Sequence, residues 1–122
     1  MKVLILGANG LVGSSLTKNL KRSDTVTEII TSTREDTNLF SFDETSNLIK
    51  NSKPNIVINA AAKVGGIYAN NTKRTEFILE NLKINVNILE ASIPFPNMFI
   101  INLGSSCIYP LDAQNPIKES SI

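Results

Sequence analysis

Short apolar runs alternate with longer segments of helical spacing along the whole chain. Four runs have the β-branched or Leu-rich composition of buried strands, and they cover Val3–Leu6, Glu28–Ser32, Ile56–Ala60 and Met98–Leu103. The segments between them predict helices at about 11–21, 42–51 and 72–92. The resulting order, β-α-β-α-β-α-β, is typical of an α/β fold in which right-handed crossovers build a doubly wound parallel sheet with helices on both faces.

The longest predicted helix carries a stripe of five apolar residues at steps of three and four, namely Ile78, Leu82, Val86, Leu89 and Ile93. Such a stripe fits a face that packs on the sheet, and it equally fits a face that packs on another helix. Residues 61–71, which precede this helix, are expected to form a loop around Gly65-Gly66. If the four strands take the order 3-2-1-4, the fourth strand lies at one edge of the sheet.

Three of the six glycines fall in the seven residues that follow the first strand, Gly7-Ala8-Asn9-Gly10-Leu11-Val12-Gly13. A glycine-rich turn between a strand and a helix lets a phosphate approach bare backbone N–H groups, where the positive end of the helix dipole faces the anion. The spacing G-x-x-G-x-x-G is one residue looser than the standard dinucleotide fingerprint. A turn without a ligand would also fit this spacing, whereas the place directly after an N-terminal strand favours a nucleotide site.

Composition narrows the class of protein. A length of 122 residues, with 42% apolar and 19% charged residues, fits one globular domain and is short for a two-domain enzyme. The net charge of +1 gives no bias toward nucleic acid or a membrane surface. The single Cys107 excludes an internal disulfide, and without any His it argues against a metal site. No apolar run approaches transmembrane length, so we expect a cytoplasmic protein.

Three further stretches carry a resemblance to a known family. They are Ala60–Ile67, Ala69–Thr72 and Leu103–Pro110, the last with the sequence Leu-Gly-Ser-Ser-Cys-Ile-Tyr-Pro. With the glycine loop, they make the chain resemble the GDP-L-fucose synthases of the extended short-chain dehydrogenase/reductase superfamily, over essentially its whole length. The resemblance implies a Rossmann-like fold and an NADPH-dependent epimerase/reductase that converts GDP-4-keto-6-deoxy-D-mannose to GDP-L-fucose.

The resemblance also implies which residues contact the cofactor. They are Gly7, Ala8, Asn9, Gly10, Leu11, Val12, Gly13, Arg34, Asn38, Leu39, Ala60, Ala61, Ala62, Leu103, Gly104, Ser105 and Ser106. An Arg after the second strand accommodates the 2′-phosphate of NADP, so Arg34 predicts NADP(H). A solvated surface role would also fit Arg34, and a carboxylate of Glu35 or Asp36 that folds back toward a ribose would weaken the prediction.

Two catalytic residues follow from the same resemblance. Ser105 matches the serine that hydrogen-bonds the C4 carbonyl of the sugar and polarises it for hydride attack. Cys107 matches the cysteine that acts as acid and base beside this carbonyl during epimerisation. From the residues alone, Ser105 would equally fit a turn after a strand, and Cys107 a buried, inert thiol.

The resemblance also exposes an absence. The family's Tyr-x-x-x-Lys pair and catalytic His have no counterpart, because neither Tyr68 nor Tyr109 has a Lys four residues later and the chain contains no His. We therefore expect a cofactor-binding domain that is incomplete at its C-terminal end, lacks the substrate domain and is inactive alone. The substrate of the complete enzyme is expected to be a GDP-sugar. A homodimer, or docking to a complementing C-terminal part, is the expected assembly. A non-catalytic NADP-binding or interaction module, and another nucleotide-sugar epimerase or dehydratase, remain alternatives.

Overall fold

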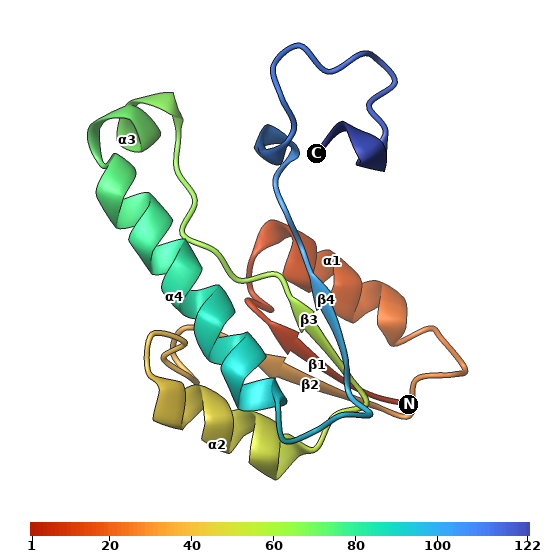
Figure 1. Cartoon of the computed structure of the whole chain (residues 1–122). Coiled ribbons are helices and arrows are strands. Elements are labelled where there is room, and N and C mark those ends of the chain that lie inside the picture. The colour runs from red at the N-terminus through yellow and green to blue at the C-terminus, as the bar shows by residue number, and fades with distance from the viewer.

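The computed structural model describes residues 1–122 and contains one parallel sheet between two layers of helices (Figure 1). The strands are β1 (Lys2–Leu6), β2 (Glu28–Ser32), β3 (Ile56–Asn59) and β4 (Phe99–Asn102). The helices are α1 (Leu11–Leu20), α2 (Phe42–Ser52), α3 (Ile67–Thr72) and α4 (Arg74–Ser92), followed by the short 3₁₀ turns Ser106–Ile108 and Glu119–Ser121. The predicted α/β class is confirmed.

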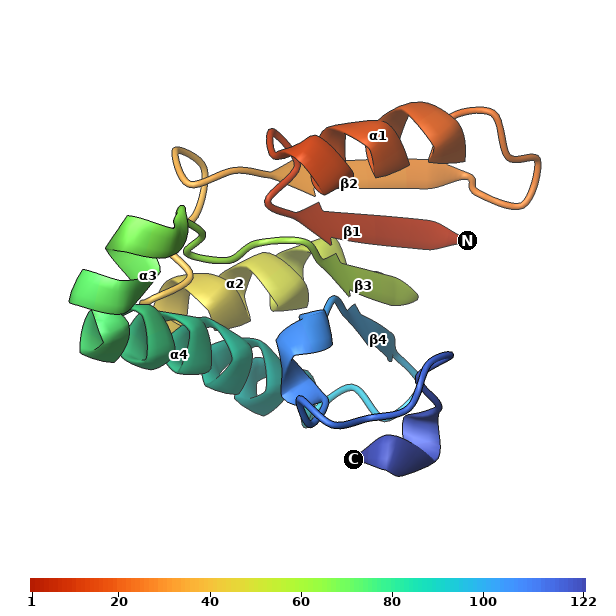
Figure 2. The same ribbon diagram turned by 90° about the horizontal axis from the view of Figure 1, so that it is seen from above.

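Helix α1 covers one face of the sheet, whereas α2 and α4 cover the other (Figure 2). Successive side chains of a strand point to opposite faces, so β1 contributes to both layers of the core. Val3 and Ile5 belong to the cluster beneath α1, and Leu4 and Leu6 belong to the larger cluster beneath α2 and α4. Burial on both faces explains why β1 is a continuous apolar run.

The observed strand order is β2-β1-β3-β4, so the expected order 3-2-1-4 is wrong. The chain leaves β2 through α2 and returns on the far side of β1, which places β3 between β1 and β4. Alternation of strands and helices specifies the crossovers, but it does not say on which side of β1 the third strand is added. As expected, β4 lies at an edge. The carboxyl ends of β1 and β3 now flank the point where the order reverses, which is where open α/β sheets bind ligands.

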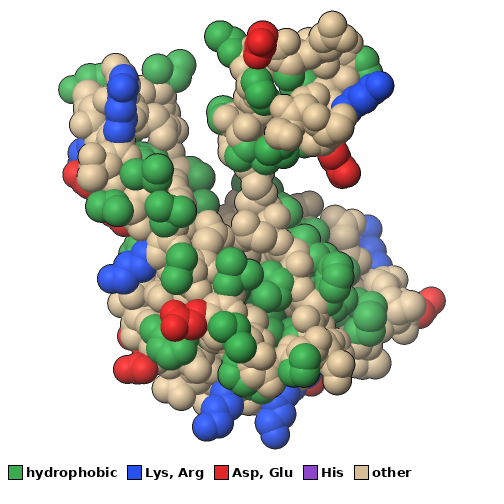
Figure 3. All heavy atoms as spheres, viewed as in Figure 1, with side chains coloured by type: hydrophobic (Ala, Val, Ile, Leu, Met, Phe, Trp, Pro, Cys, Tyr) green, Lys and Arg blue, Asp and Glu red, His purple; other side chains and the backbone are tan.

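The segment before the longest helix is not entirely loop, because Ile67–Thr72 form α3. The apolar stripe of α4 does not pack on the sheet. The five apolar residues of the predicted stripe are between 53% and 76% exposed. The buried side of α4 carries instead Ile84, Asn87, Ile88, Ala91 and Ser92. The helix is apolar on two sides, and the stripe lies on its open side, where apolar side chains gather in Figure 3.

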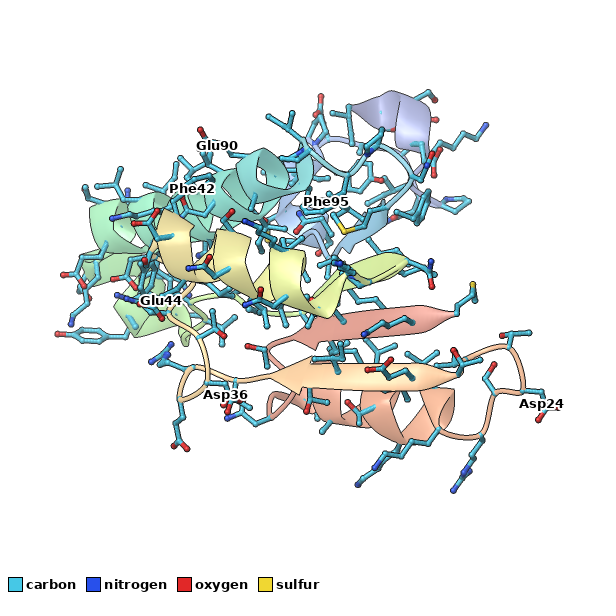
Figure 4. The ribbon with its side chains drawn as sticks, turned by 90° about the horizontal axis from the view of Figure 1, so that it is seen from below. Asp24, Asp36, Phe42, Glu44, Glu90 and Phe95 are labelled. Atoms are coloured by element: carbon cyan, nitrogen blue, oxygen red, sulfur yellow. The ribbon has the colours of Figure 1, made fainter.

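A cap at the start of α2 positions the segment before it. Oγ of Ser41 accepts from the backbone N–H of Glu44 at 3.3 Å, as in the capping box that the pattern Ser-x-x-Glu favours. The Glu44 carboxylate reaches back to the backbone N–H of Asn38 at 2.9 Å rather than to Ser41. Glu44 lies at the first turn of α2 in Figure 4. The cap therefore anchors Asn38 and Leu39 beside the carboxyl end of the sheet.

Candidate cofactor and substrate site

The glycine loop packs too closely for side chains at two positions. Gly7 has φ +74°, and a Cβ there would lie 2.7 Å from the carbonyl oxygen of Ala60. A Cβ on Gly13 would lie 2.2 Å from the carbonyl oxygen of Gly7. The N–H groups of Gly7 and Ala8 donate to the carbonyl of Ser32 at 2.9 and 3.1 Å, which ties the loop to the end of β2.

Helix α1 presents its free N-terminus beside this loop. Its N-cap residue is Gly10, which has no side chain to accept from the N–H groups of the first turn. An anion placed there would receive these hydrogen bonds and face the positive end of the helix dipole.

A pocket of about 400 Å³ opens at this N-terminus, a volume in the range of small-molecule sites. Ten residues of the predicted cofactor set line it, namely Gly7, Asn9, Gly10, Leu11, Val12, Arg34, Leu39, Ala60, Ala61 and Ala62. They come from the ends of β1, β2 and β3, which the strand order brings together. We call this pocket the cofactor pocket.

The remaining residues of the predicted cofactor set lie elsewhere. Ala8 is buried beneath α1, and Gly13 is a close packing contact. Asn38 uses its side chain to accept from the N–H of Phe40 at 3.1 Å. The residues after β4 line a second cleft, described below, with the exception of Ser106, which lines neither.

Five further residues line the cofactor pocket: Thr33, Thr37, Phe40, Val64 and Ile84. Sequence reasoning missed Thr37, Phe40 and Ile84, of which the first two are direct neighbours in sequence of the predicted Asn38 and Leu39. Ile84 has no such signal, because it reaches the pocket from α4.

Arg34 is the cation of the cofactor pocket, and it takes part in none of the ion pairs of the chain. The nearby carboxylate of Asp36 is held by Thr33, whose backbone N–H and hydroxyl donate to Oδ2 at 2.8 and 2.7 Å. These two hydrogen bonds lower the pKa of Asp36 below its usual value of 3.8. Asp36 therefore does not occupy the pocket, and neither does Glu35.

A second cleft adjoins the cofactor pocket and shares Ala61, Ala62 and Val64 with it. It lies between the α3–α4 arm and the chain after β4, where the surface is hollowed in Figure 3. We call it the second cleft. Ser105 and Cys107 line its β4 side.

Ser105 begins the 3₁₀ turn that follows β4. Its Oγ accepts from the N–H of Cys107 at 3.2 Å, so the turn role that the residues alone suggested is present. Because this bond uses an oxygen lone pair, the hydroxyl hydrogen stays free to donate to a ligand. Cys107 is exposed, which excludes a buried thiol.

Lys63 lies on the opposite wall of the second cleft. Its Nζ forms ion pairs with Glu80 and, at 3.3 Å, with Glu76, and lies 5.4 Å from the centre of the Phe77 ring. The hydrogen bond to Glu80 raises the pKa of Lys63, and the one to Glu76 adds to this against desolvation. Two carboxylates therefore compensate its charge.

Side-chain amides connect the elements around the two pockets. Oδ1 of Asn81 accepts from the N–H of Lys63 at 2.8 Å, and its Nδ2 donates to the Lys63 carbonyl at 3.0 Å. The buried Asn59, at the end of β3, donates to Asn85 of α4 and to Asn102 of β4. Sequence reasoning missed these residues, because isolated asparagines carry no motif.

Comparison with known proteins identifies the family. Residues 3–122 match the model of the NAD dependent epimerase/dehydratase family. The chain belongs to this family. The resemblance seen in the sequence is confirmed.

Two curated relatives and one solved structure are enzymes that act on GDP-sugars, according to their names. The chain is 36% identical over 122 residues to a GDP-L-colitose synthase from Yersinia pseudotuberculosis, with 100% of the chain and 39% of the relative covered. It is 38% identical over 121 residues to a GDP-L-fucose synthase from Sinorhizobium fredii, covering 99% of the chain and 38% of the relative. The structure of MlghC, a GDP-mannoheptose C4 reductase from Campylobacter jejuni with NADP bound, matches with a TM-score of 0.85 and 32% identity over 98% of the chain and 38% of that protein.

The chain thus spans about two fifths of the length of the relatives that it matches. None of its helices combines the length and the apolar character that a membrane span requires.

Proposed function

We propose that this chain forms the cofactor-binding part of an NADPH-dependent epimerase/reductase that converts GDP-4-keto-6-deoxy-D-mannose to GDP-L-fucose. One observation carries the proposal: the pocket at the glycine loop adjoins the cleft of Ser105 and Cys107 along a shared wall, Ala61-Ala62. A cofactor in the first pocket and a sugar in the second would meet at that wall.

The cofactor pocket fits a dinucleotide phosphate. A Cβ at Gly7 would clash with the backbone of Ala60, so this turn needs glycine, and the uncapped first turn of α1 supplies N–H donors for a pyrophosphate. Arg34 would bind the 2′-phosphate of the adenosine ribose through charge-assisted hydrogen bonds. When bound, NADPH supplies the hydride that reduces the keto sugar.

Ser105 and Cys107 act on the sugar in this proposal. The free hydroxyl hydrogen of Ser105 donates to the C4 carbonyl oxygen and stabilises the negative charge that develops there. The Cys107 thiolate removes a proton from a carbon next to the carbonyl. Return of a proton to the opposite face needs a second acid, which the complementing C-terminal part would supply. Exposure of both residues on one side of the second cleft supports these roles.

The alkoxide left by reduction needs a proton, for which this chain offers no Tyr-x-x-x-Lys pair. A complementing C-terminal polypeptide would provide the pair and cover the apolar edge at β4, where Phe99 and Ile101 are 65% and 39% exposed. The open stripe of α4 would pack against a second copy or against that polypeptide. By itself, the 122-residue chain is not expected to turn over substrate.

A non-catalytic NADP-binding module is the second candidate, and the hydrogen bond by which Oγ of Ser105 caps its own turn favours it, because it gives this serine a structural role. The two candidates share the cofactor pocket and differ in the second cleft. Another nucleotide-sugar epimerase or dehydratase would share both and differ in the substrate or the reaction.

A chimera decides between these candidates. The chain is fused to the C-terminal part of the Sinorhizobium fredii GDP-L-fucose synthase, and NADPH oxidation is measured with GDP-4-keto-6-deoxy-D-mannose and with a dTDP-linked keto sugar. The proposal expects oxidation with the GDP sugar, a slower reduction step in Ser105→Ala, and reduced deuterium uptake from solvent in Cys107→Ser. A folded, NADPH-binding chimera without turnover favours the module. Preference for the dTDP sugar favours another substrate.

A further inference from the structure

The amide of Asn59 can adopt only one orientation. The backbone N–H of Ala61 donates to its Oδ1 at 3.1 Å, and a backbone N–H cannot accept a hydrogen bond. The other end of the amide is therefore Nδ2, which donates to Oδ1 of Asn85 at 3.0 Å and to Oδ1 of Asn102 at 2.7 Å. Both hydrogens of this buried amide are used.

A second backbone group fixes the same polarity independently. Nδ2 of Asn85 donates to the backbone carbonyl of Asn81 at 2.9 Å, and a carbonyl can only accept. Asn85 must then turn its Oδ1 toward Asn59, as the first argument requires. Because two backbone anchors agree, the orientation of the whole network follows from chemistry rather than from a choice between oxygen and nitrogen.

This polarity has a consequence at the end of β4. Asn102 gives its Oδ1 to Asn59, so its NH₂ group points away from the network and has no partner in the chain. Asn102 lines the second cleft together with Ser105 and Cys107. The parallel register pairs Asn59 with Asn102, so both side chains lie on the α4 face of the sheet.

We propose that Asn102 is a substrate-binding residue, whose Nδ2 donates a hydrogen bond to an oxygen of the sugar of a nucleotide sugar in the second cleft. The inference rests on the proposed function and deepens it. The 2.7 Å bond to Asn59 holds the donor in place before the ligand arrives, so little side-chain freedom is lost on binding. The Ser105 hydroxyl and the Asn102 amide place two hydrogen-bond donors on this wall of the cleft. Two donors suit a ligand rich in carbonyl and hydroxyl oxygens.

The test uses the 122-residue chain saturated with NADP⁺, and GDP-mannose as the probe. NMR follows the side-chain NH₂ signals, and titration calorimetry gives the dissociation constant. We expect the Asn102 NH₂ signal to shift on addition of GDP-mannose while the Asn59 NH₂ signal stays protected from solvent exchange. Asn102→Ala should raise the dissociation constant of GDP-mannose about 3- to 10-fold, which corresponds to the loss of one neutral hydrogen bond. Asn102→Asp keeps an acceptor for Asn59 but loses the donor to the ligand, so it should raise the dissociation constant of GDP-mannose at least as much.

The control is Asn51→Ala, since Asn51 is exposed on α2 and lines neither pocket. Equal GDP-mannose affinity in wild type and both Asn102 variants, or an unshifted Asn102 signal, overturns the inference. NADP⁺ binding is measured first and separately. Its absence contradicts the proposed function, whereas its presence without an effect at Asn102 contradicts only the role of Asn102.

Discussion

Thr33 holds the carboxylate of Asp36 through two hydrogen bonds, from its backbone N–H at 2.8 Å and from its hydroxyl at 2.7 Å. Asp36 lies on the loop that leaves β2, as Figure 4 shows. The contact keeps a negative charge out of the pocket that Arg34 lines, so the loop offers a phosphate a cation without a competing anion. The sequence alone left open whether Asp36 would fold back toward a ribose.

Asp36→Asn is expected to change how stability depends on pH. The hydrogen bonds from Thr33 lower the folded-state pKa of Asp36 below 3.8. The ionised carboxylate therefore stabilises the fold above pH 3.8, and this contribution is lost as the pH falls through the lowered pKa. Thermal unfolding of wild type and Asp36→Asn is compared from neutral to strongly acidic pH. The difference in Tm should shrink at the acid end, and a constant difference would contradict the assigned contact.

Gly13→Ala is expected to destabilise the chain. The new methyl group would lie 2.2 Å from the carbonyl oxygen of Gly7, so the loop or α1 must shift, at a cost of about 1–3 kcal/mol or more in the free energy of unfolding. Gly66→Ala is the matched control, since nothing lies within 4 Å of the position of its Cβ. Urea unfolding measures both. Equal stabilities for the two variants would show that the loop does not pack as described.

Some features of the fold and site follow from local sequence. A continuous apolar run before Gly7 predicts a central strand, and the S-x-x-E pattern at Ser41 predicts the start of α2, because both depend on neighbouring residues. The residues of the glycine loop could likewise be placed, since strand ends and helix starts meet at one edge of such a sheet.

Other features depend on contacts between distant segments. The bond from Asn59 to Asn102 exists only because β3 and β4 are paired in one particular register. The side of α4 that faces the sheet was not predictable either, because Ile84 and Ile88 compete with Leu82 and Leu89 as an apolar face. Periodicity identifies both faces as apolar but does not specify which one the sheet covers.

The open stripe of α4 leads to a prediction about assembly. Five apolar side chains that are more than half exposed, together with the unpaired edge of β4, favour association with a second copy. Sedimentation of the purified chain is expected to show dimers or larger species. Leu89→Glu should shift the distribution toward monomer, whereas Asn47→Glu, on the exposed side of α2, should leave it unchanged. A monomeric wild-type chain would contradict this prediction.

The affinities of the chain for NADPH and for NADH show whether the glycine-loop pocket binds a dinucleotide and whether Arg34 selects NADPH. Both are titrated by nicotinamide fluorescence against wild type, Arg34→Ala and the control Arg22→Ala, whose arginine lies outside both pockets. A charge-assisted contact with the 2′-phosphate is worth about 1.5–3 kcal/mol. Wild type and Arg22→Ala should therefore prefer NADPH at least about tenfold, and Arg34→Ala should lose that preference while binding NADH as before. No binding of either nucleotide would contradict a cofactor site at the glycine loop, and an equal loss of both in Arg34→Ala would contradict the role of Arg34.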